Sequence, residues 1–199
     1  MMQVQELVLA THNPAKISEL TAMLAPYSVK LTSAAALGLD EPKETGATFQ
    51  ENALLKAKFV AEASGKPALA DDSGICFPSL NDFPGVHTAP YRMSFPTLED
   101  CFQDLERRLK ETGDTRAYVH CSLCLYYPDG KYTMFEGRID GEFVYPVRGE
   151  TTDGYHFDIV FQPDGYDQTY AQLGIETKNK ISHRARSFAK FIETCLKSE

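Results

Sequence analysis

The sequence predicts an α/β fold in which helices flank a mixed β-sheet. Segments with helical periodicity alternate with short apolar segments along the whole chain. Residues 128–130, Pro-Asp-Gly, separate two extended segments, which indicates a hairpin and therefore some antiparallel pairing. The 199 residues suffice for one buried core, and no composition shift marks a boundary. We therefore expect a single domain over residues 1–199.

The first predicted elements are a strand over residues 4–10 and a helix after a polar turn. The strand segment is short and largely apolar, and apolar residues then recur at helical spacing from Ile17 to Leu24. Either Thr11 or Asn13 can cap this helix, and Pro14 suits its first turn.

A second helix is expected from Thr48, because Thr48 and Glu51 have the spacing of a capping box. On this helix Asn52 and Lys56 are four residues apart and share one face. The remaining elements are expected as a brief strand at 68–70, a helix at 97–111, hairpin strands at 116–127 and 131–140, a strand near 157–161 and a last helix from about residue 182.

Charge and composition exclude several classes of protein. The net charge of −8 argues against a protein that neutralises many nucleic-acid phosphates. No stretch approaches the ~20 apolar residues of a membrane span, and residues 1–10 lack the pattern of a signal peptide. Five scattered cysteines suit a reducing compartment. We expect a cytoplasmic protein without nucleic-acid or membrane partners, which needs basic residues or a divalent cation to bind a polyphosphate.

The turn at residues 11–16 is a candidate phosphate site. A turn that leads into a helix N-terminus offers free backbone N–H groups to an anion, and Lys16 adds a positive charge. It is not a Walker A loop, which has the pattern G-x-x-x-x-G-K-[ST]. A capped surface helix with a solvated lysine remains an alternative interpretation.

Asp71 and Asp72 are candidates for metal binding and general-base chemistry. Adjacent carboxylates repel each other, so without a cation one of them tends to be protonated. On a strand the two side chains face opposite sides, which predicts different tasks. We expect one to bind Mg²⁺ and activate water, and the other to hold the loop through backbone hydrogen bonds. An acidic turn ending in Gly74 is the alternative interpretation.

Two further segments contain candidate nucleotide contacts. Residues 154–158 form a polar and aromatic loop in which rings could stack on a base and Asp158 could accept hydrogen bonds, although aromatic core residues fit the pattern too. We expect residues 178–186 to place several cations at the start of the last helix. Cations there oppose the helix dipole, which favours a bound anion between them over a solvated basic face. These cations are Lys178, Lys180, His183, Arg184 and Arg186.

Together these clusters resemble the inosine triphosphate pyrophosphatase family, also called the Ham1 or RdgB-like family. The matching segments occur in the family's order across nearly the whole chain, at 11–16, 44–46, 48–49, 51–53, 70–74, 84–86, 154–158 and 182–184. The resemblance implies an elongated fold with two lobes and a central cleft, and a homodimer. It also implies Mg²⁺-dependent hydrolysis of ITP, dITP and XTP to the monophosphate and pyrophosphate, which removes deaminated purines from the nucleotide pool.

The resemblance also implies roles for individual residues. Asp72 looks like the metal ligand and general base, with Glu44 as a second ligand and Ser73 as a neighbouring substrate contact. The phosphate-binding turn corresponds to Thr11, His12, Asn13, Pro14, Ala15 and Lys16. The loop that cradles the base corresponds to Tyr155, His156, Phe157 and Asp158, and Lys178, His183 and Arg184 complete nucleotide recognition. His183 or Arg184 could donate to the 6-oxo group that distinguishes hypoxanthine and xanthine from adenine.

Three positions differ from the family pattern. Lys43 stands where the family has a second acid, so metal binding rests on Glu44 or draws in Glu41, and His156 replaces a glycine. The basic residue that usually follows Pro-Gly is replaced within residues 86–91, which include Pro90, although Arg92 could substitute for it. These differences keep two alternatives open. One is the same chemistry on a modified or pyrimidine nucleotide, and the other is a nucleotide-binding protein without turnover.

Overall fold

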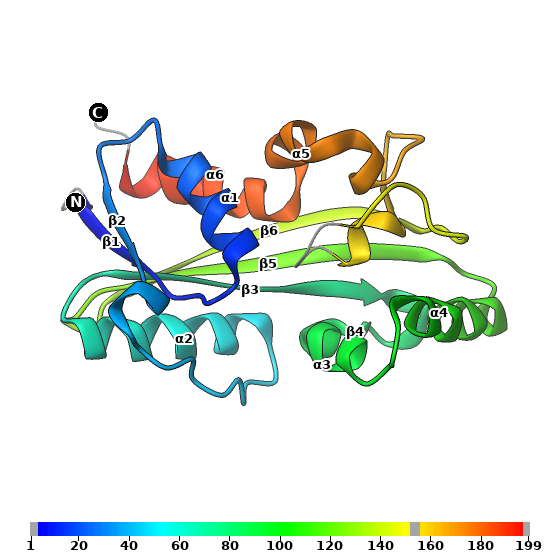
Figure 1. Cartoon of the computed structure of the whole chain (residues 1–199), viewed down its shortest axis with the longest axis horizontal. Helices are drawn as coiled ribbons and strands as arrows, with labels where there is room; N and C mark the ends of the chain where they lie inside the picture. Colours follow the sequence, from blue (N-terminus) through cyan, green and yellow to red (C-terminus); the bar gives the residue numbers. More distant parts are fainter. Residues whose placement is uncertain (1–3, 152–155, 197–199) are drawn as a thin grey trace. The chain divides into compact units, whose positions relative to one another are not determined.

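The computed structural model describes residues 4–151 and 156–196. The strands are β1 (Glu6–Leu9), β2 (Lys30–Ser33), β3 (Ala68–Phe77), β4 (Phe83–Pro84), β5 (Arg116–Tyr126), β6 (Tyr132–Phe143) and β7 (Phe161–Pro163). The α-helices are α1 (Pro14–Leu24), α2 (Phe49–Ser64), α3 (Thr88–Met93), α4 (Leu98–Thr112), α5 (Tyr170–Ile181) and α6 (His183–Cys195). Helices and strands alternate along the chain as the sequence predicts (Figure 1).

The seven described strands form one mixed sheet in the order β2-β1-β3-β5-β6-β7, with β4 paired to β3. The strand β1 runs parallel to both β2 and β3. The pairs β3–β4 and β6–β7 are antiparallel. A tight turn joins β5 to β6, and within it the Tyr127 amide donates to the Lys131 carbonyl at 2.8 Å. The predicted α/β class, mixed sheet and hairpin are confirmed.

The chain folds into two compact units. The first unit is Met1–Asp72, Cys121–Gly137 and Arg184–Glu199, and the second is Ser73–His120 and Arg138–His183. The chain therefore passes between the units four times, at Asp72–Ser73, His120–Cys121, Gly137–Arg138 and His183–Arg184. The expectation of a single domain stays a prediction.

In the first unit, helices cover both faces of the sheet. Leu7 and Leu9 of β1 pack in one apolar cluster with residues of α1 and α6, whereas Val8 packs in a second cluster with residues of α2. Figure 1 shows the same arrangement, with α1 and α6 on one face of these strands and α2 on the other. Because successive strand residues point to opposite faces, this alternation buries both sides of β1.

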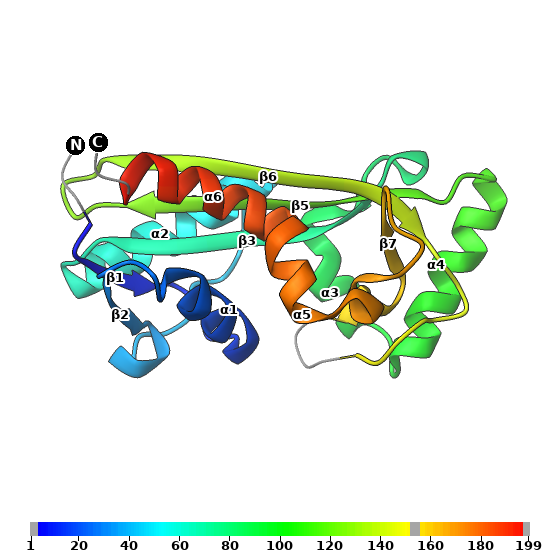
Figure 2. The same cartoon turned by 90° about the horizontal axis from the view of Figure 1, so that it is seen from above.

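The second unit is built around aromatic side chains. Phe77 of β3 contacts Phe143 of β6 edge to face at 5.9 Å, and Phe102 of α4 contacts Phe157 at 5.6 Å. The helix α4, which Figure 2 shows from above, buries its apolar side in this cluster. Its N-terminus is a capping box made by Thr97. The helix predicted over 97–111 is confirmed.

Local signals also set the start of two helices in the first unit. Asn13, rather than Thr11, caps α1, and Pro14 occupies its first position. Thr48 and Glu51 form the predicted capping box of α2. Such caps stabilise a helix by about 1 kcal/mol because they satisfy N–H groups that have no partner within the helix.

Three expectations about secondary structure are wrong. The strand β3 does not end at residue 70 but continues through the acidic motif to Phe77. Residues 156–159 form a 3₁₀ helix instead of a strand, and the strand β7 begins only at Phe161. Lys178 and Lys180 lie in the last turn of a separate helix, α5, where positive charges interact favourably with the helix dipole.

None of the helices in the described part of the chain has the length and apolar character of a membrane span.

Candidate functional site

The turn between β1 and α1 carries the predicted phosphate-binding residues. The Asn13 side chain accepts hydrogen bonds from the amides of Ala15 at 2.9 Å and Lys16 at 3.4 Å. The Asn13 amide in turn donates to the Thr11 hydroxyl at 3.2 Å. The amides of Ala15 and Lys16 are therefore engaged by the helix cap, although we expected free N–H groups here. The positive charge of the turn comes from Lys16.

Asp71 is fully buried and binds two cationic side chains. Its Oδ2 atom lies 3.0 Å from Lys16 Nζ and 3.1 Å from an Arg184 guanidinium nitrogen. Another nitrogen of Arg184 contacts Glu19 at 2.7 Å. Burial alone raises the pKa of Asp71, but Lys16 and Arg184 more than offset this effect and hold the pKa well below its usual value. Asp71 therefore remains ionised, and its ion pairs join the turn before α1 to Arg184. The expectation that it also holds the loop through backbone hydrogen bonds stays a prediction.

Asp72 has a different set of partners, which come from α2 and the segment before it. Lys56 Nζ lies 3.0 Å from Asp72 Oδ1, and the Asn52 amide donates to Asp72 Oδ2 at 3.3 Å. The same Lys56 ammonium contacts Glu44 at 2.6 Å. The prediction that the two adjacent aspartates face different surroundings is confirmed. Lys56, Asn52 and Glu19 enter this site although sequence reasoning gave none of them a role in it, and the shared face of Asn52 and Lys56 was the available signal.

Close packing at Gly46 helps to hold these groups. The Gly46 amide donates to Asn52 Oδ1 at 2.8 Å. A Cβ atom at position 46 would lie 2.7 Å from the same oxygen, which is closer than side chains tolerate. Glycine is thus required at this position, because Asn52 must approach the backbone while its amide nitrogen faces Asp72.

Burial and charge together tune Asp72 and Lys56. Burial raises the pKa of Asp72, and the negative charge of Glu44 adds to this effect against the opposing charge of Lys56. Burial lowers the pKa of Lys56, but the neighbouring carboxylates, Asp72 first, raise it above its usual value. Lys56 is therefore a permanent cation at neutral pH, and it lies between two carboxylates.

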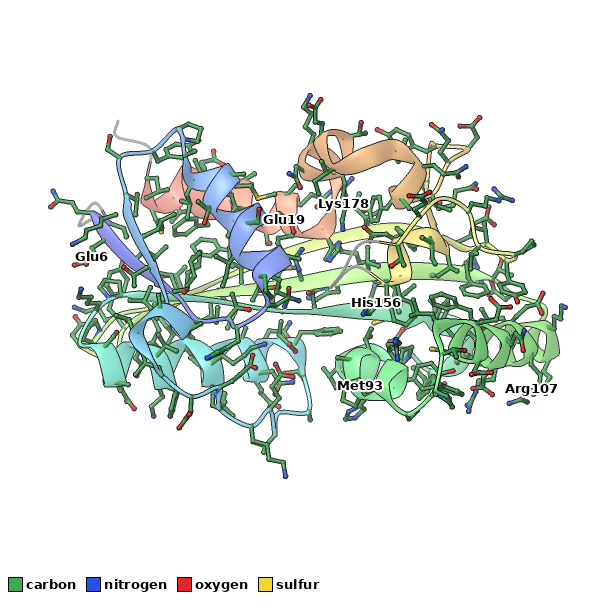
Figure 3. The ribbon with its side chains drawn as sticks, in the orientation of Figure 1. Glu6, Glu19, Met93, Arg107, His156 and Lys178 are labelled. Atoms are coloured by element: carbon green, nitrogen blue, oxygen red, sulfur yellow. The ribbon has the colours of Figure 1, made fainter. Side chains whose placement is uncertain are left out.

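The remaining predicted site residues that the structure describes belong to the second unit. Lys178 of α5, which is labelled in Figure 3, is buried. Its ammonium pairs with the Asp158 carboxylate at 2.5 Å. His156 begins the 3₁₀ helix 156–159, and Phe157 packs against the aromatic core. Ser73 follows Asp72 in β3, and His183 is the buried first residue of α6. Tyr155 lies outside the described residues.

The ion-paired cluster of the first unit has more negative than positive groups. Its charged members are Glu19, Glu44, Asp71 and Asp72 on one side and Lys16, Lys56 and Arg184 on the other. Among the described residues, no group of three or more His, Cys, Asp or Glu side chains converges as a complete metal site. The two carboxylates of this cluster that share one cation are those of Glu44 and Asp72, which both contact Lys56.

Comparison with known proteins assigns the family. The model of the Ham1 family matches residues 7–194, which is nearly the whole chain. The chain belongs to the Ham1 family. Among solved structures, a Ham1 protein from Coxiella burnetii has a TM-score of 0.87 and 31% identity, covering 96% of this chain and 98% of its own. The Ham1 protein of Staphylococcus aureus has a TM-score of 0.82 and 32% identity, with 96% and 99% covered.

Relatives with assigned activities also match over almost their full length. The dITP/XTP pyrophosphatase of Agrobacterium fabrum is 40% identical, and the match covers 99% of each chain. The dITP/XTP pyrophosphatase of Zymomonas mobilis is 39% identical over 96% of this chain and 92% of its own. The resemblance inferred from short motifs is thus confirmed, and these relatives are dITP/XTP pyrophosphatases.

Proposed function

We propose that this chain hydrolyses dITP, ITP and XTP to the nucleoside monophosphate and pyrophosphate, and so removes deaminated purines from the nucleotide pool. The relatives named dITP/XTP pyrophosphatase, which match nearly the full chain, support this substrate class. One observation carries the proposal. The adjacent carboxylates of Asp71 and Asp72 bind separate cations. Asp71 can therefore hold Lys16, the proposed phosphate-binding residue, while Asp72 remains available as metal ligand and general base.

Glu44 and Asp72 are the residues that would hold Mg²⁺. Their carboxylates already converge on a single cation, the Lys56 ammonium, at 2.6 and 3.0 Å. In proteins Mg²⁺ is usually bound by one or two carboxylates together with waters and substrate phosphates, and this pair fits that donor set. The chemistry that a bound magnesium ion supplies is neutralisation of charge on the phosphate oxygens and polarisation of the phosphorus.

Asp72 is the general base of the proposed reaction. The oxygen of water forms a bond to one phosphorus of the α–β phosphoanhydride while the bridging P–O bond breaks and the leaving phosphate oxygen takes its electron pair. One proton of the attacking water passes to the Asp72 carboxylate. A buried carboxylate accepts a proton more readily than an exposed one, which suits this role. The Asn52 amide and the Lys56 ammonium fix the orientation of the Asp72 carboxylate through bonds to its two oxygens.

Lys16 and Arg184 have distinct tasks on the other side of β3. The Lys16 side chain is 20% exposed, so its ammonium can turn from Asp71 to a phosphate oxygen. The Arg184 side chain is 3% exposed and is held by both Asp71 and Glu19. We assign Lys16 to binding of the phosphates and Arg184 to holding the Asp71 carboxylate in place. The expected contact between Arg184 and the nucleobase stays a prediction.

A substrate panel tests the proposal. The protein is incubated with Mg²⁺ and ITP, XTP, dITP, GTP, ATP, UTP or CTP, and pyrophosphate release is measured. We expect strong preference for ITP, XTP and dITP. Their 6-oxo group distinguishes these bases from adenine, which presents an amine there, whereas rejection of guanine must rest on its 2-amino group. Release from another nucleotide would replace the substrate class, and tight binding without release would favour a nucleotide-binding protein.

Two variants separate the mechanism from folding. Asp72→Asn keeps the shape of the side chain but removes the base, and we expect a loss of several orders of magnitude in kcat. Asp129→Asn is the control, because Asp129 is an exposed turn residue that pairs with Lys131. Full turnover by the Asp72 variant would refute the proposed role of this residue.

We also propose that the protein acts in the cytoplasm as a homodimer that requires Mg²⁺, on the strength of the family resemblance. Light scattering coupled to size exclusion measures the assembly. A mass near twice 22.2 kDa would support the dimer, and a single-chain mass would contradict it.

Removal of divalent cations with a chelator is expected to abolish turnover, and added Mg²⁺ is expected to restore it.

A further inference from the structure

The segment that carries Glu44 lacks regular structure. Residues 39–46, here called the Glu44 segment, contain no helix or strand and are mostly exposed. Fixing an irregular segment in one conformation costs backbone entropy. A carboxylate in such a segment therefore has a defined position only where other contacts hold the segment in place. The identity of these anchors therefore decides where Glu44 lies.

Two side-chain anchors come from α2 and another comes from the turn before α1. The Leu39 amide also donates to the Ala34 carbonyl at 3.1 Å, and the Leu39 side chain packs against an apolar cluster of the first unit. Asn52 accepts from the Gly46 amide at 2.8 Å, and Lys56 contacts Glu44 at 2.6 Å. At the other end of the segment, His12 Nε2 lies 2.8 Å from the Leu39 carbonyl oxygen. His12 is 27 residues away in sequence and belongs to the turn that carries Lys16. This bond thus links the Glu44 segment directly to the candidate phosphate-binding turn.

The chemistry of the bond fixes the state of the imidazole. A carbonyl oxygen can only accept, so His12 Nε2 carries the hydrogen and donates it to Leu39. The other ring nitrogen, Nδ1, is buried and has no hydrogen-bond partner in the described part of the chain. Among the described residues, the bond to the Leu39 carbonyl is therefore the side-chain hydrogen bond that orients the ring.

We propose that His12 is a positioning residue, whose hydrogen bond to Leu39 holds the Glu44 segment against the turn that carries Lys16. This bond would fix the position of the Glu44 carboxylate, proposed to bind the metal, relative to the Lys16 ammonium, proposed to bind phosphate, although the two residues come from different segments of the chain. Its consequence for hydrolysis rests on the proposed function, whereas the anchoring itself can be tested without any substrate.

Hydrogen exchange of the substrate-free, full-length chain tests the anchoring. His12→Ala removes the donor, and His12→Gln places an amide nitrogen where Nε2 lies. We expect amides of residues 39–46 to exchange about 2- to 12-fold faster in His12→Ala, as loss of one net hydrogen bond implies, and near the wild-type rate in His12→Gln. Lys190→Ala is the matched control, because it removes a side-chain bond to the Glu136 carbonyl on an exposed surface.

Kinetics then test the positioning role. For His12→Ala we expect the half-saturating Mg²⁺ concentration and the KM for XTP to rise about 2- to 12-fold, with a smaller change in kcat and recovery in His12→Gln. Unchanged exchange in His12→Ala, or equally fast exchange in both variants, would overturn the anchoring. Faster exchange with unchanged Mg²⁺ dependence and KM would overturn the positioning role. If the wild-type chain hydrolyses no nucleotide, the proposed function fails, and the exchange result still decides the anchoring.

Discussion

Replacing Asp71 by asparagine should destabilise the fold far more than the same change at Asp72. Asp71→Asn removes one carboxylate partner of the Arg184 guanidinium, whose side chain is 3% exposed, and leaves the Glu19 contact in place. It also strips Lys16 of its carboxylate, although Lys16 is 20% exposed and can reach water. The variant therefore breaks a buried ion pair while both cations stay in the fold.

The contacts set the size of the effect. Removing one partner of a buried pair costs about 3–5 kcal/mol of unfolding free energy, and the retained Glu19 contact places this case near 3 kcal/mol. At Asp72, Lys56 keeps Glu44 at 2.6 Å, and an asparagine oxygen can still accept from it. Asp72→Asn should thus cost about 1 kcal/mol.

Urea unfolding followed by circular dichroism measures both variants. With an m-value of about 3 kcal/mol/M, Asp71→Asn should lower the unfolding midpoint by about 1 M and Asp72→Asn by about 0.3 M. Equal midpoints for the two variants would refute the division of roles between the adjacent aspartates. A loss of activity in Asp72→Asn without a matching loss of stability would support it.

Three further predictions concern the stability of the fold. Asp104 accepts from the Tyr91 hydroxyl at 2.8 Å and pairs with two arginines, and although burial raises its pKa, these partners lower the pKa overall. Asp104→Asn should therefore cost about 1–2 kcal/mol at pH 7, and in pH-dependent unfolding the difference should shrink as the pH falls below about 4, because a depressed carboxyl pKa stabilises the fold only above that range. Gly141→Ala places a Cβ atom against the Gln162 carbonyl of β7 and should cost about 2–3 kcal/mol, which a normal melting temperature would contradict. Thr48→Ala removes the cap of α2 and should cost about 1 kcal/mol in urea unfolding, whereas Thr48→Ser should be nearly neutral.

Elements with local signals could be predicted from the sequence. The helix α2 begins where Thr48 and Glu51 form a capping box, and α4 begins after Thr97 for the same reason. The helix α5 was missed although Thr169 and Gln172 form a third capping box. Gly174 has a positive φ inside this helix and interrupts its periodicity, so the local pattern was too weak to see.

The acidic motif misled the prediction of β3 for a physical reason. Two aspartates followed by serine and glycine are typical of a turn, because charged side chains seldom lie inside a strand without partners. Here the partners come from distant parts of the chain, since Lys56 precedes Asp72 by 16 residues and Arg184 follows Asp71 by 113. No local pattern reveals such pairing. The resemblance to the family singled out Asp72, Glu44 and Lys16, but it did not show that Lys56 lies between the two carboxylates.

Pyrophosphate release from XTP, measured with saturating Mg²⁺ for the wild-type chain, Asp72→Asn and Asp129→Asn, tests the central claim most directly. The account predicts rapid release by the wild type and the Asp129 variant, and a loss of several orders of magnitude in Asp72→Asn with near-normal urea unfolding. Comparable turnover in all three proteins would contradict the assignment of Asp72 as the general base.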